Sequence, residues 1–356
     1  MSDRLKMPPV RDCGFYQRRK HDKWREVAPP EPALESLVAD SHAHIHMLPD
    51  PAWELVRCAA NGVDYLCMIV DPAEDGSRPF DELDAWVAQA ARYLESGSGV
   101  DGDAVLPEPS TVPVRSESKP DESAASAASA GGLSAAVASG LQAPHVRIAV
   151  GVHPHNARSY DAEMEKTLLE RLSDSRVGAL GEIGLDYHYD FSPRDVQRRV
   201  FERQVAIAKE MGLPIALHLR AGDDPVADDA HREAFEILQT VGFPGAGTLL
   251  HCCALPPDEL RPWVEAGCYV AYGGAITFKN ADAAREGARI VPEDRLMVET
   301  DSPYMTPEPM RGAACTPAHV VFTAARLAEA RGIEPGGNRA RFLAQLHDNT
   351  ERFYAR

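Results

Sequence analysis

Short apolar runs alternate with longer segments of helical periodicity along this chain, and the alternation begins near Leu37. There are eight such runs, at 37–40, 65–70, 146–152, 177–183, 214–219, 247–251, 269–272 and 296–300. Apolar runs without polar alternation are typical of strands buried on both faces, as in a parallel sheet. Eight consecutive strand–helix units therefore predict the α/β class and a closed (β/α)8 TIM-type barrel. An open doubly wound sheet is the alternative fold.

The segment between the fourth and fifth runs shows the helical pattern most clearly. Within 194–211 one face of the expected helix is apolar and is formed by Val200, Phe201, Val205, Ala208 and Met211. Gly212 and Pro214 are expected to end this helix and to begin the next strand.

Two stretches fall outside this alternation. Residues 1–35 are polar and locally basic, which favours an N-terminal arm, extended or irregular, ahead of a barrel at 36–356. Residues 96–145 are rich in Ser, Ala, Gly and acidic side chains and contain few large apolar residues. Such a segment buries too little apolar surface to fold alone. We expect a disordered low-complexity insertion between the second helix and the third strand; a regulatory or partner-binding loop is the alternative.

Charge and cysteine content limit the class of protein. A formal net charge of -17 disfavours broad nonspecific attraction to nucleic acid or to an anionic membrane. A nucleic-acid substrate held at a metal site remains an open alternative, because bound cations change the local electrostatic field. The 7 cysteines include no CxxC pair, which is typical of reduced thiols. The N-terminal residues show no secretory signal and no apolar run is long enough for a membrane span. These features predict a cytoplasmic protein without membrane association, with a nuclear location also open. They do not predict any particular stable protein partner.

Histidines follow several of the predicted strands at the point where each strand ends. His42 and His44 are two residues apart, so an extended chain points both imidazoles to the same side. His218 and His251 end the fifth and sixth strands, and Arg220 follows His218. The carboxyl ends of barrel strands form one rim, where active sites lie. Each histidine alone is more often structural, but together they predict a metal site, with Arg220 beside it as a fork for an anionic group.

Acidic residues occupy two further strand ends. Glu182 lies in GEIGLDY at the end of the fourth apolar run, where burial is costly unless a cation or a donor compensates. Asp301 lies in ETDSPYMTP after the eighth run, and a carboxylate there could bind metal and manage the proton of a water molecule. A surface turn with a salt-bridged Glu182 is the structural alternative. Asp186 is expected to orient its neighbours, and His46 is not assigned as a ligand.

These motifs together resemble a known family. DSHAH at 40–44, GVHPH at 151–155, GEIGLDY at 181–187, His218–Arg220, His251–Cys252 and ETDSPYMTP at 299–307 are similar to the signatures of the TatD-like metal-dependent hydrolases, which belong to the amidohydrolase superfamily. The resemblance runs from about Leu37 to the C-terminus without the insertion, and it includes Gln197, Phe201 and Gln204.

The resemblance implies a TIM-type barrel, one or two divalent metal ions and a deoxyribonuclease activity that is often exonucleolytic. It implies that one ion is held by His42, His44 and Asp301, the other by His218 and His251, and that Glu182 bridges them. It places Arg220 on a substrate phosphate and His153 close to the site. The chain departs from the family pattern at Cys253, where an aromatic residue is usual, and at RGAACTP (311–317), which bears on substrate preference.

The reaction expected from these residues is hydrolysis of a phosphodiester bond in DNA by a metal-activated water, with Asp301 and Glu182 as catalytic residues. Imidazole-rich ligation suits Zn²⁺ or Mn²⁺, while the carboxylates keep Mg²⁺ open. One alternative is a metallohydrolase acting on a different small ester or amide. Another, from a different class, is a partner-binding barrel with a residual metal site.

Overall fold

The barrel strands appear where the apolar runs predict them. The computed structural model describes residues 13–19, 23–30, 34–96, 141–224 and 229–356. The strands are β3 (Val38–Ala43), β4 (Val63–Val70), β5 (His145–Val150), β6 (Val177–Asp186), β7 (Ile215–Arg220), β8 (Thr248–Leu250), β9 (Tyr269–Tyr272) and β10 (Leu296–Val298). All neighbours pair in parallel and in sequence order, from β3 to β10. A doubly wound sheet would reverse its order at a switch point, so the barrel prediction is confirmed.

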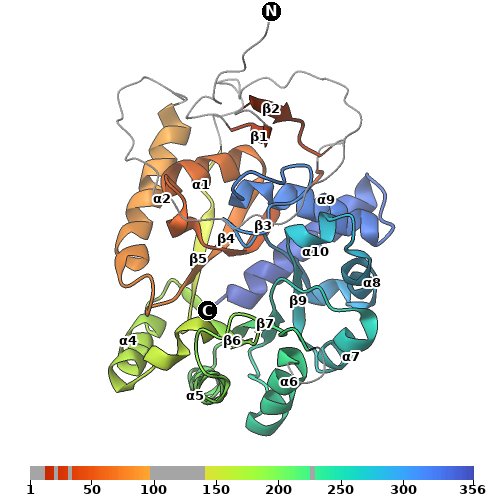
Figure 1. Ribbon diagram of the computed structural model, residues 1–356. Helices are drawn as coiled ribbons and strands as arrows, with labels where there is room; N and C mark the ends of the chain where they lie inside the picture. The colour runs from red at the N-terminus through yellow and green to blue at the C-terminus, as the bar shows by residue number, and fades with distance from the viewer. Residues whose placement is uncertain (1–12, 20–22, 31–33, 97–140, 225–228) are drawn as a thin grey trace, which may run out of the picture.

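Helices surround the strands, as Figure 1 shows in the view along the barrel. They are α1 (Pro51–Ala60), α2 (Arg78–Ser96), α4 (Ala162–Leu172), α5 (Arg194–Met211), α6 (Ala230–Val241), α7 (Pro257–Glu265), α8 (Asp282–Ile290), α9 (Val320–Ala330) and α10 (Gly337–Tyr354). Helix α5 has the predicted bounds, and Gly212 ends it with a positive φ of 66°. Short 3-10 turns follow three of the strands, η2 (Ile45–Met47), η3 (Pro154–Ser159) and η4 (Gly274–Thr277). Two others, η5 (Glu293–Arg295) and η6 (Pro317–His319), precede β10 and α9.

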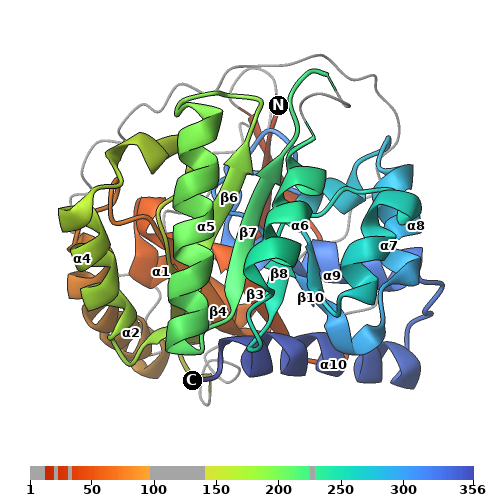
Figure 2. The same ribbon diagram turned by 90° about the horizontal axis from the view of Figure 1, so that it is seen from below.

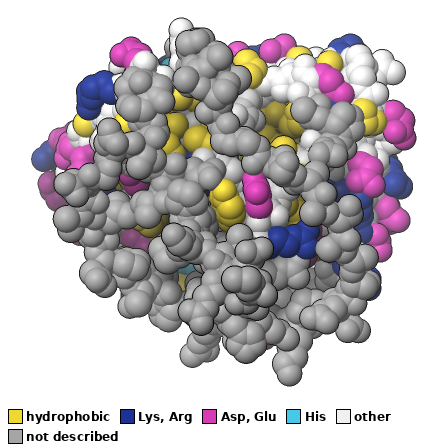
Figure 3. All heavy atoms as spheres, turned by 90° about the horizontal axis from the view of Figure 1, so that it is seen from above, with side chains coloured by type: hydrophobic (Ala, Val, Ile, Leu, Met, Phe, Trp, Pro, Cys, Tyr) yellow, Lys and Arg dark blue, Asp and Glu magenta, His cyan; other side chains and the backbone are white. Residues whose placement is uncertain are grey.

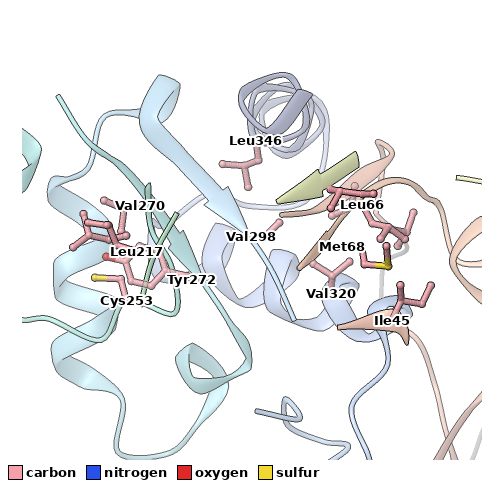
Figure 4. Close-up of a cluster of buried hydrophobic side chains, with 14 of the residues drawn as sticks. Ile45, Leu66, Met68, Leu217, Cys253, Val270, Tyr272, Val298, Val320 and Leu346 are labelled. Atoms are coloured by element: carbon pink, nitrogen blue, oxygen red, sulfur yellow. The ribbon is translucent and has the colours of Figure 1, made fainter. Parts of the chain in front are cut away.

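Side chains of the strands alternate between the barrel interior and the surrounding helices. In β4, Leu66 and Met68 belong to the large outer core that the helices cover, part of which Figure 4 shows. Tyr65, Cys67 and Ile69 belong to a separate inner cluster, which otherwise contains mostly alanines from the neighbouring strands. The apolar runs are continuous because both sides of the sheet are buried.

Helix α10 closes the lower end of the barrel. It lies across the bottom of the view in Figure 2, beneath the strands. Phe353 and Tyr354 belong to the inner cluster, and the Tyr354 hydroxyl donates to the carbonyl oxygen of Ser41 at 2.8 Å. The small alanine side chains of the interior leave room for these two aromatic rings. The opposite end, at the carboxyl ends of the strands, is where the polar residues gather.

The described part of the N-terminal arm is folded onto the barrel. β1 (Phe15–Arg19) and β2 (Lys23–Val27) form an antiparallel hairpin in which Phe15 faces Val27. Phe15 is buried, and its ring centroid lies 4.8 Å from that of Phe322 in α9. This segment therefore differs from the extended or irregular arm that its composition suggests.

The expected insertion at 96–145 lies mostly outside the described residues. Helix α2 ends at Ser96 and β5 begins at His145, so the segment joins the second barrel helix to the third barrel strand. No helix in the described ranges is long and apolar enough to cross a membrane.

Candidate metal centre

Glu182 lies at the centre of a cluster of imidazoles at the barrel mouth. It sits in β6, is buried, and turns one carboxylate oxygen to each side. Its Oε2 lies 3.3 Å from His42 Nε2 and 3.9 Å from His44 Nε2. Its Oε1 lies 2.7 Å from His218 Nδ1 and 3.0 Å from His251 Nε2. One carboxylate therefore joins two pairs of histidines that come from the ends of three strands, β3, β7 and β8.

Asp301 completes the group on the side of His42 and His44. Its Oδ1 lies 3.6 Å from His44 Nε2 and 3.8 Å from His42 Nε2. The residue has a positive φ of 58°, a conformation that few non-glycine residues adopt. Two backbone bonds hold this segment: Asp301 N–H donates to His42 O at 2.9 Å, and His44 N–H donates to Ser302 O at 2.8 Å. The structure thus brings together all six residues that the sequence suggested as ligands.

The donor atoms fit divalent metal ions. The two nitrogens of His42 are buried and make no hydrogen bond within the described part of the chain. Across those same ranges, no Lys or Arg forms an ion pair with Glu182 or Asp301, whose charged neighbours are all imidazoles. Buried carboxylates need a positive partner, and neutral imidazoles offer lone pairs rather than charge. Cations that accept mixed nitrogen and oxygen ligands meet both needs.

Electrostatics in the cluster are tightly coupled. Burial opposes the charge of Glu182, but the surrounding imidazoles, His251 foremost, outweigh burial and hold the pKa of Glu182 well below its usual range. Burial likewise opposes the charge of His218, but its bonds to Asp186 and Glu182 outweigh burial and raise the pKa of His218 to about 8. The site therefore favours ionised carboxylates that attract positive charge.

Two further carboxylates lie behind the second pair of histidines. Asp186 Oδ2 lies 3.1 Å from His218 Nε2 and 2.7 Å from His155 Nε2. Glu299 Oε1 lies 3.2 Å from His251 Nδ1, and Glu299 is fully buried. His218 and His251 thus each have a second carboxylate at the nitrogen that does not face Glu182, an arrangement that orients metal-ligating histidines.

The sequence indicated only part of this outer layer. Asp186 was expected to orient its neighbours, and its contact with His218 agrees with that. The contacts of His155 and Glu299 were not expected. A usable signal was the even spacing of the acidic residues, which puts side chains on the same face of an extended chain. Glu182 and Asp186 are four residues apart in β6, and Glu299 and Asp301 are two residues apart after β10.

His153 lies against the cluster without joining the hydrogen-bonded set. Its Nε2 is 3.8 Å from Glu182 Oε1, and its ring centroid is 4.3 Å from that of His218. The backbone N–H of His155 donates to His153 Nδ1 at 3.2 Å. Because Nδ1 accepts this bond, the proton of the neutral ring is on Nε2, which faces the centre.

Arg220 occupies the rim rather than the centre. Its side chain is exposed at the end of β7, with the guanidinium carbon 4.6 Å from the ring centroid of Tyr189. Within the described ranges, no carboxylate forms an ion pair with it. His46, by contrast, pairs with Asp75 at 2.9 Å, away from Glu182, as expected for a residue that is not a ligand.

A parallel (β/α)8 barrel with converging histidines and carboxylates at the carboxyl ends of its strands defines a class, the barrel metallohydrolases. The family model described as TatD related DNase matches residues 39–355, and the chain belongs to this family. It is a metal-dependent hydrolase of the TatD type, with hydrolase chemistry at ester bonds.

Relatives and solved structures agree with this assignment. The chain is 38% identical over 181 residues to the metal-dependent hydrolase YabD of Bacillus subtilis. The matched region is 51% of this chain and 68% of YabD. The chain is 32% identical over 207 residues to the 3'-5' ssDNA/RNA exonuclease TatD of Enterobacter lignolyticus, covering 57% of this chain and 75% of that protein. The crystal structure of the TatD homologue YJJV from Escherichia coli has the same fold, with a TM-score of 0.60, 22% identity and coverage of 89% and 97%.

Proposed function

We propose that this chain is a metal-dependent deoxyribonuclease that removes nucleotides from the 3' end of a DNA strand by hydrolysing phosphodiester bonds. The observation that carries this proposal is the position of Glu182, whose two carboxylate oxygens face two separate pairs of histidines. Relatives named 3'-5' ssDNA/RNA exonuclease support the choice of substrate and direction.

The proposed ligands divide into two groups that share Glu182. His42, His44 and Asp301 would hold one ion, while His218 and His251 would hold the other. Four imidazoles favour Zn²⁺ or Mn²⁺ over Mg²⁺, which prefers oxygen ligands. When bound, such ions supply Lewis acidity toward the phosphoryl group and lower the pKa of the attacking water.

Asp301 is the proposed proton acceptor. Its side chain is 16% exposed, whereas that of Glu182 is 7% exposed, so Asp301 is the carboxylate that reaches the open side of the centre. A carboxylate in that position can orient a water molecule and take its proton during attack on phosphorus.

His153 and Arg220 are proposed to bind the substrate. The Nε2–H of His153 points toward the centre and can donate to a phosphate oxygen. Arg220 stands farther out on the rim, where its planar guanidinium can receive the next phosphate along the strand. Hydrogen bonds and positive charge at these two positions would stabilise charge that develops on the phosphate oxygens.

One observation favours the alternative of a different small ester or amide substrate. Among the side chains coloured in Figure 3, acidic and basic groups are interspersed. Together with the net charge of -17, this gives little long-range attraction for a polyanion. The complete set of converging ligands disfavours a partner-binding barrel without catalysis.

The test is metal-dependent release of nucleotides from end-labelled single- and double-stranded DNA. We expect cleavage by the wild type with Mn²⁺, Zn²⁺ or Mg²⁺, and a loss of about 100-fold or more in Asp301→Asn, in line with the removal of a proton acceptor. Asp258→Asn, an exposed acid on α7, is the matched control and should keep full activity. No cleavage by folded, metal-loaded wild type would exclude the nuclease and leave the small-substrate hydrolase.

A further inference from the structure

Among the side chains that the structure describes, the exposed rings of Tyr and Phe lie at the barrel mouth. In the described ranges, the exposed aromatic side chains are Tyr189, Phe191 and Tyr304, with 48%, 54% and 49% of their surface accessible. All three follow strand ends that carry proposed metal ligands: Tyr189 and Phe191 come after β6, and Tyr304 comes shortly after Asp301. Aromatic rings that leave about half of their surface exposed at one site are typical of surfaces that receive a partner ring.

Tyr189 is anchored to the metal centre through Asp186. The Asp186 carboxylate accepts the backbone N–H of His188 at 2.9 Å and that of Tyr189 at 3.0 Å through its Oδ1. Its other oxygen, Oδ2, lies 3.1 Å from His218 Nε2. A single side chain therefore joins a proposed metal ligand to the backbone that carries the exposed ring. The ring is held in a fixed place beside the site.

Contacts of the neighbouring Ser192 and of His155 hold Phe191 in place. The Ser192 hydroxyl donates to the carbonyl oxygen of His155 at 2.8 Å, and Gln197 Nε2 donates to Ser192 O at 2.8 Å. His155 packs edge-on against Phe191, with ring centroids 4.8 Å apart and an interplanar angle of 86°. These contacts fix the loop while leaving half of the Phe191 ring open to solvent.

The two rings stack on each other, and a cation lies over the ring of Tyr189. Tyr189 and Phe191 are parallel within 3°, with centroids 5.4 Å apart, and Arg220 lies over Tyr189 at 4.6 Å. Planar rings offer a face to any nucleobase, and stacking of this kind requires a base that is free of its neighbours and its complement. The adjoining guanidinium suits the phosphate of the same nucleotide.

We propose that Tyr189 and Phe191 form a stacking surface for a nucleobase of a single-stranded substrate, with Arg220 on its phosphate. This inference rests on the proposed nuclease function, because that function supplies a strand at the site. Tyr304 lies on the other side, with its ring centroid 6.1 Å from that of His44. A strand that crosses the centre would thus meet an aromatic ring on each side of the bond to be cut.

The test uses a single-stranded oligonucleotide with 2-aminopurine near its 3' end and phosphorothioate linkages that resist cleavage. Stacking quenches 2-aminopurine fluorescence, so titration with the metal-loaded protein reports base contact without turnover. We expect saturable quenching by the wild type. Tyr189→Leu and Phe191→Leu should each weaken binding by about tenfold and remove the quenching, since stacking dominates such contacts. Phe191→Tyr, which keeps an aromatic ring, should retain both the binding and the quenching of the wild type.

Leu169→Ala, a change at an exposed apolar residue on α4, is the control and should leave binding and quenching unchanged. Quenching that is absent in the wild type, or identical in the Tyr189 and Phe191 variants, would overturn the stacking surface. Failure of the nuclease itself appears separately, as unmodified DNA that stays intact. A second comparison uses two cleavable strands, one with normal nucleotides and one with abasic sites near its 3' end. Equal cleavage of the two strands would support the nuclease and exclude the stacking surface.

Discussion

The backbone N–H of Asp301 donates to the carbonyl oxygen of His42, at an N···O distance of 2.9 Å. This bond joins the first barrel strand, β3, to the segment that follows the last one, β10. The carbonyl and the N–H belong to two residues whose side chains face the same group of donors. Closing the barrel and assembling this side of the proposed metal centre are therefore one structural event.

The shared position of Glu182 predicts how metal content responds to mutation. Glu182→Gln removes the ligand common to both groups and should weaken binding of both ions by at least about 100-fold, because even outer-layer changes cost 10–100-fold. His44→Ala should affect one ion and leave the group of His218 and His251 loaded. The metal content of each variant after dialysis, and calorimetric titration of each variant with Mn²⁺, measure these two effects. Glu170→Gln, on the surface of α4, is the control. A full complement of metal in Glu182→Gln would contradict the shared ligand.

The barrel closure also depends on a buried hydroxyl. Thr300 Oγ1 donates to Asp40 Oδ2 at 2.5 Å, and both residues are fully buried. Thr300→Val keeps the shape but leaves the carboxyl group short of one donor, so the free energy of unfolding should fall by about 1–3 kcal/mol. Urea denaturation measures the change. Thr167→Val removes an exposed hydroxyl that bonds to Glu163 O and should cost far less. Equal losses in the two variants would argue against the closure bond.

A buried histidine outside the metal centre predicts a pH dependence of stability. Burial, with a smaller effect of Arg57, lowers the pKa of His319 from 6.5 to about 3, and Thr316 N–H donates to its Nδ1 at 3.1 Å. Between these two pKa values the unfolded chain binds a proton that the folded chain excludes. Stability from this residue is therefore complete above pH 6.5 and falls as the pH is lowered toward 3, by up to about 1.4 kcal/mol per pH unit.

His319→Gln should remove this slope, because glutamine can accept the Thr316 bond without titrating. Unfolding midpoints at several pH values compare the variant with the wild type, and their difference isolates the one residue. His145→Gln, at an exposed position, provides the matched control. Parallel pH profiles for wild type and His319→Gln would show that His319 does not titrate in this way.

The N-terminal hairpin should contribute to the stability of the barrel. Phe15 is 2% exposed and packs on Phe322, so Phe15→Ala should lower the free energy of unfolding by about 3 kcal/mol. Gln17→Ala changes a partly exposed residue of the same strand, whose side chain bonds to Arg311 O at 3.4 Å, and should have little effect. Thermal unfolding of both variants measures the difference. An unchanged midpoint for Phe15→Ala would mean that the hairpin packs without stabilising the fold.

The sequence predicted the barrel well because a parallel sheet buries both faces and so leaves continuous apolar runs. The sequence predicted the strand ends at the site less well. The apolar run ends at 183, whereas β6 continues to Asp186. The run stops short because the last residue of the strand, Asp186, is acidic. The hairpin was missed because its stability comes from the distant Phe322 rather than from alternation in its own residues.

The six proposed ligands were found from residue type and strand position, which the barrel topology brings together at one rim. Arg220 was expected beside the metals, yet the structure places it over Tyr189 at the edge of the mouth. The direction of a long side chain depends on loop geometry. The parallel rings of Tyr189 and Phe191 likewise depend on the turn after Asp186, for which the sequence carries no periodic signal.

Helix α10, which closes the lower end of the barrel, is the last helix of this chain to be synthesised. Residues 337–354 emerge after all eight barrel strands, and Phe353 and Tyr354 fill the barrel interior. A nascent chain that stops short of Asp301 already holds five of the six proposed ligands, but it lacks the bond that closes the ring. Such a chain would have an open lower end and an incomplete set of donors. The complete set of proposed ligands thus exists only in chains whose synthesis has passed the last strand.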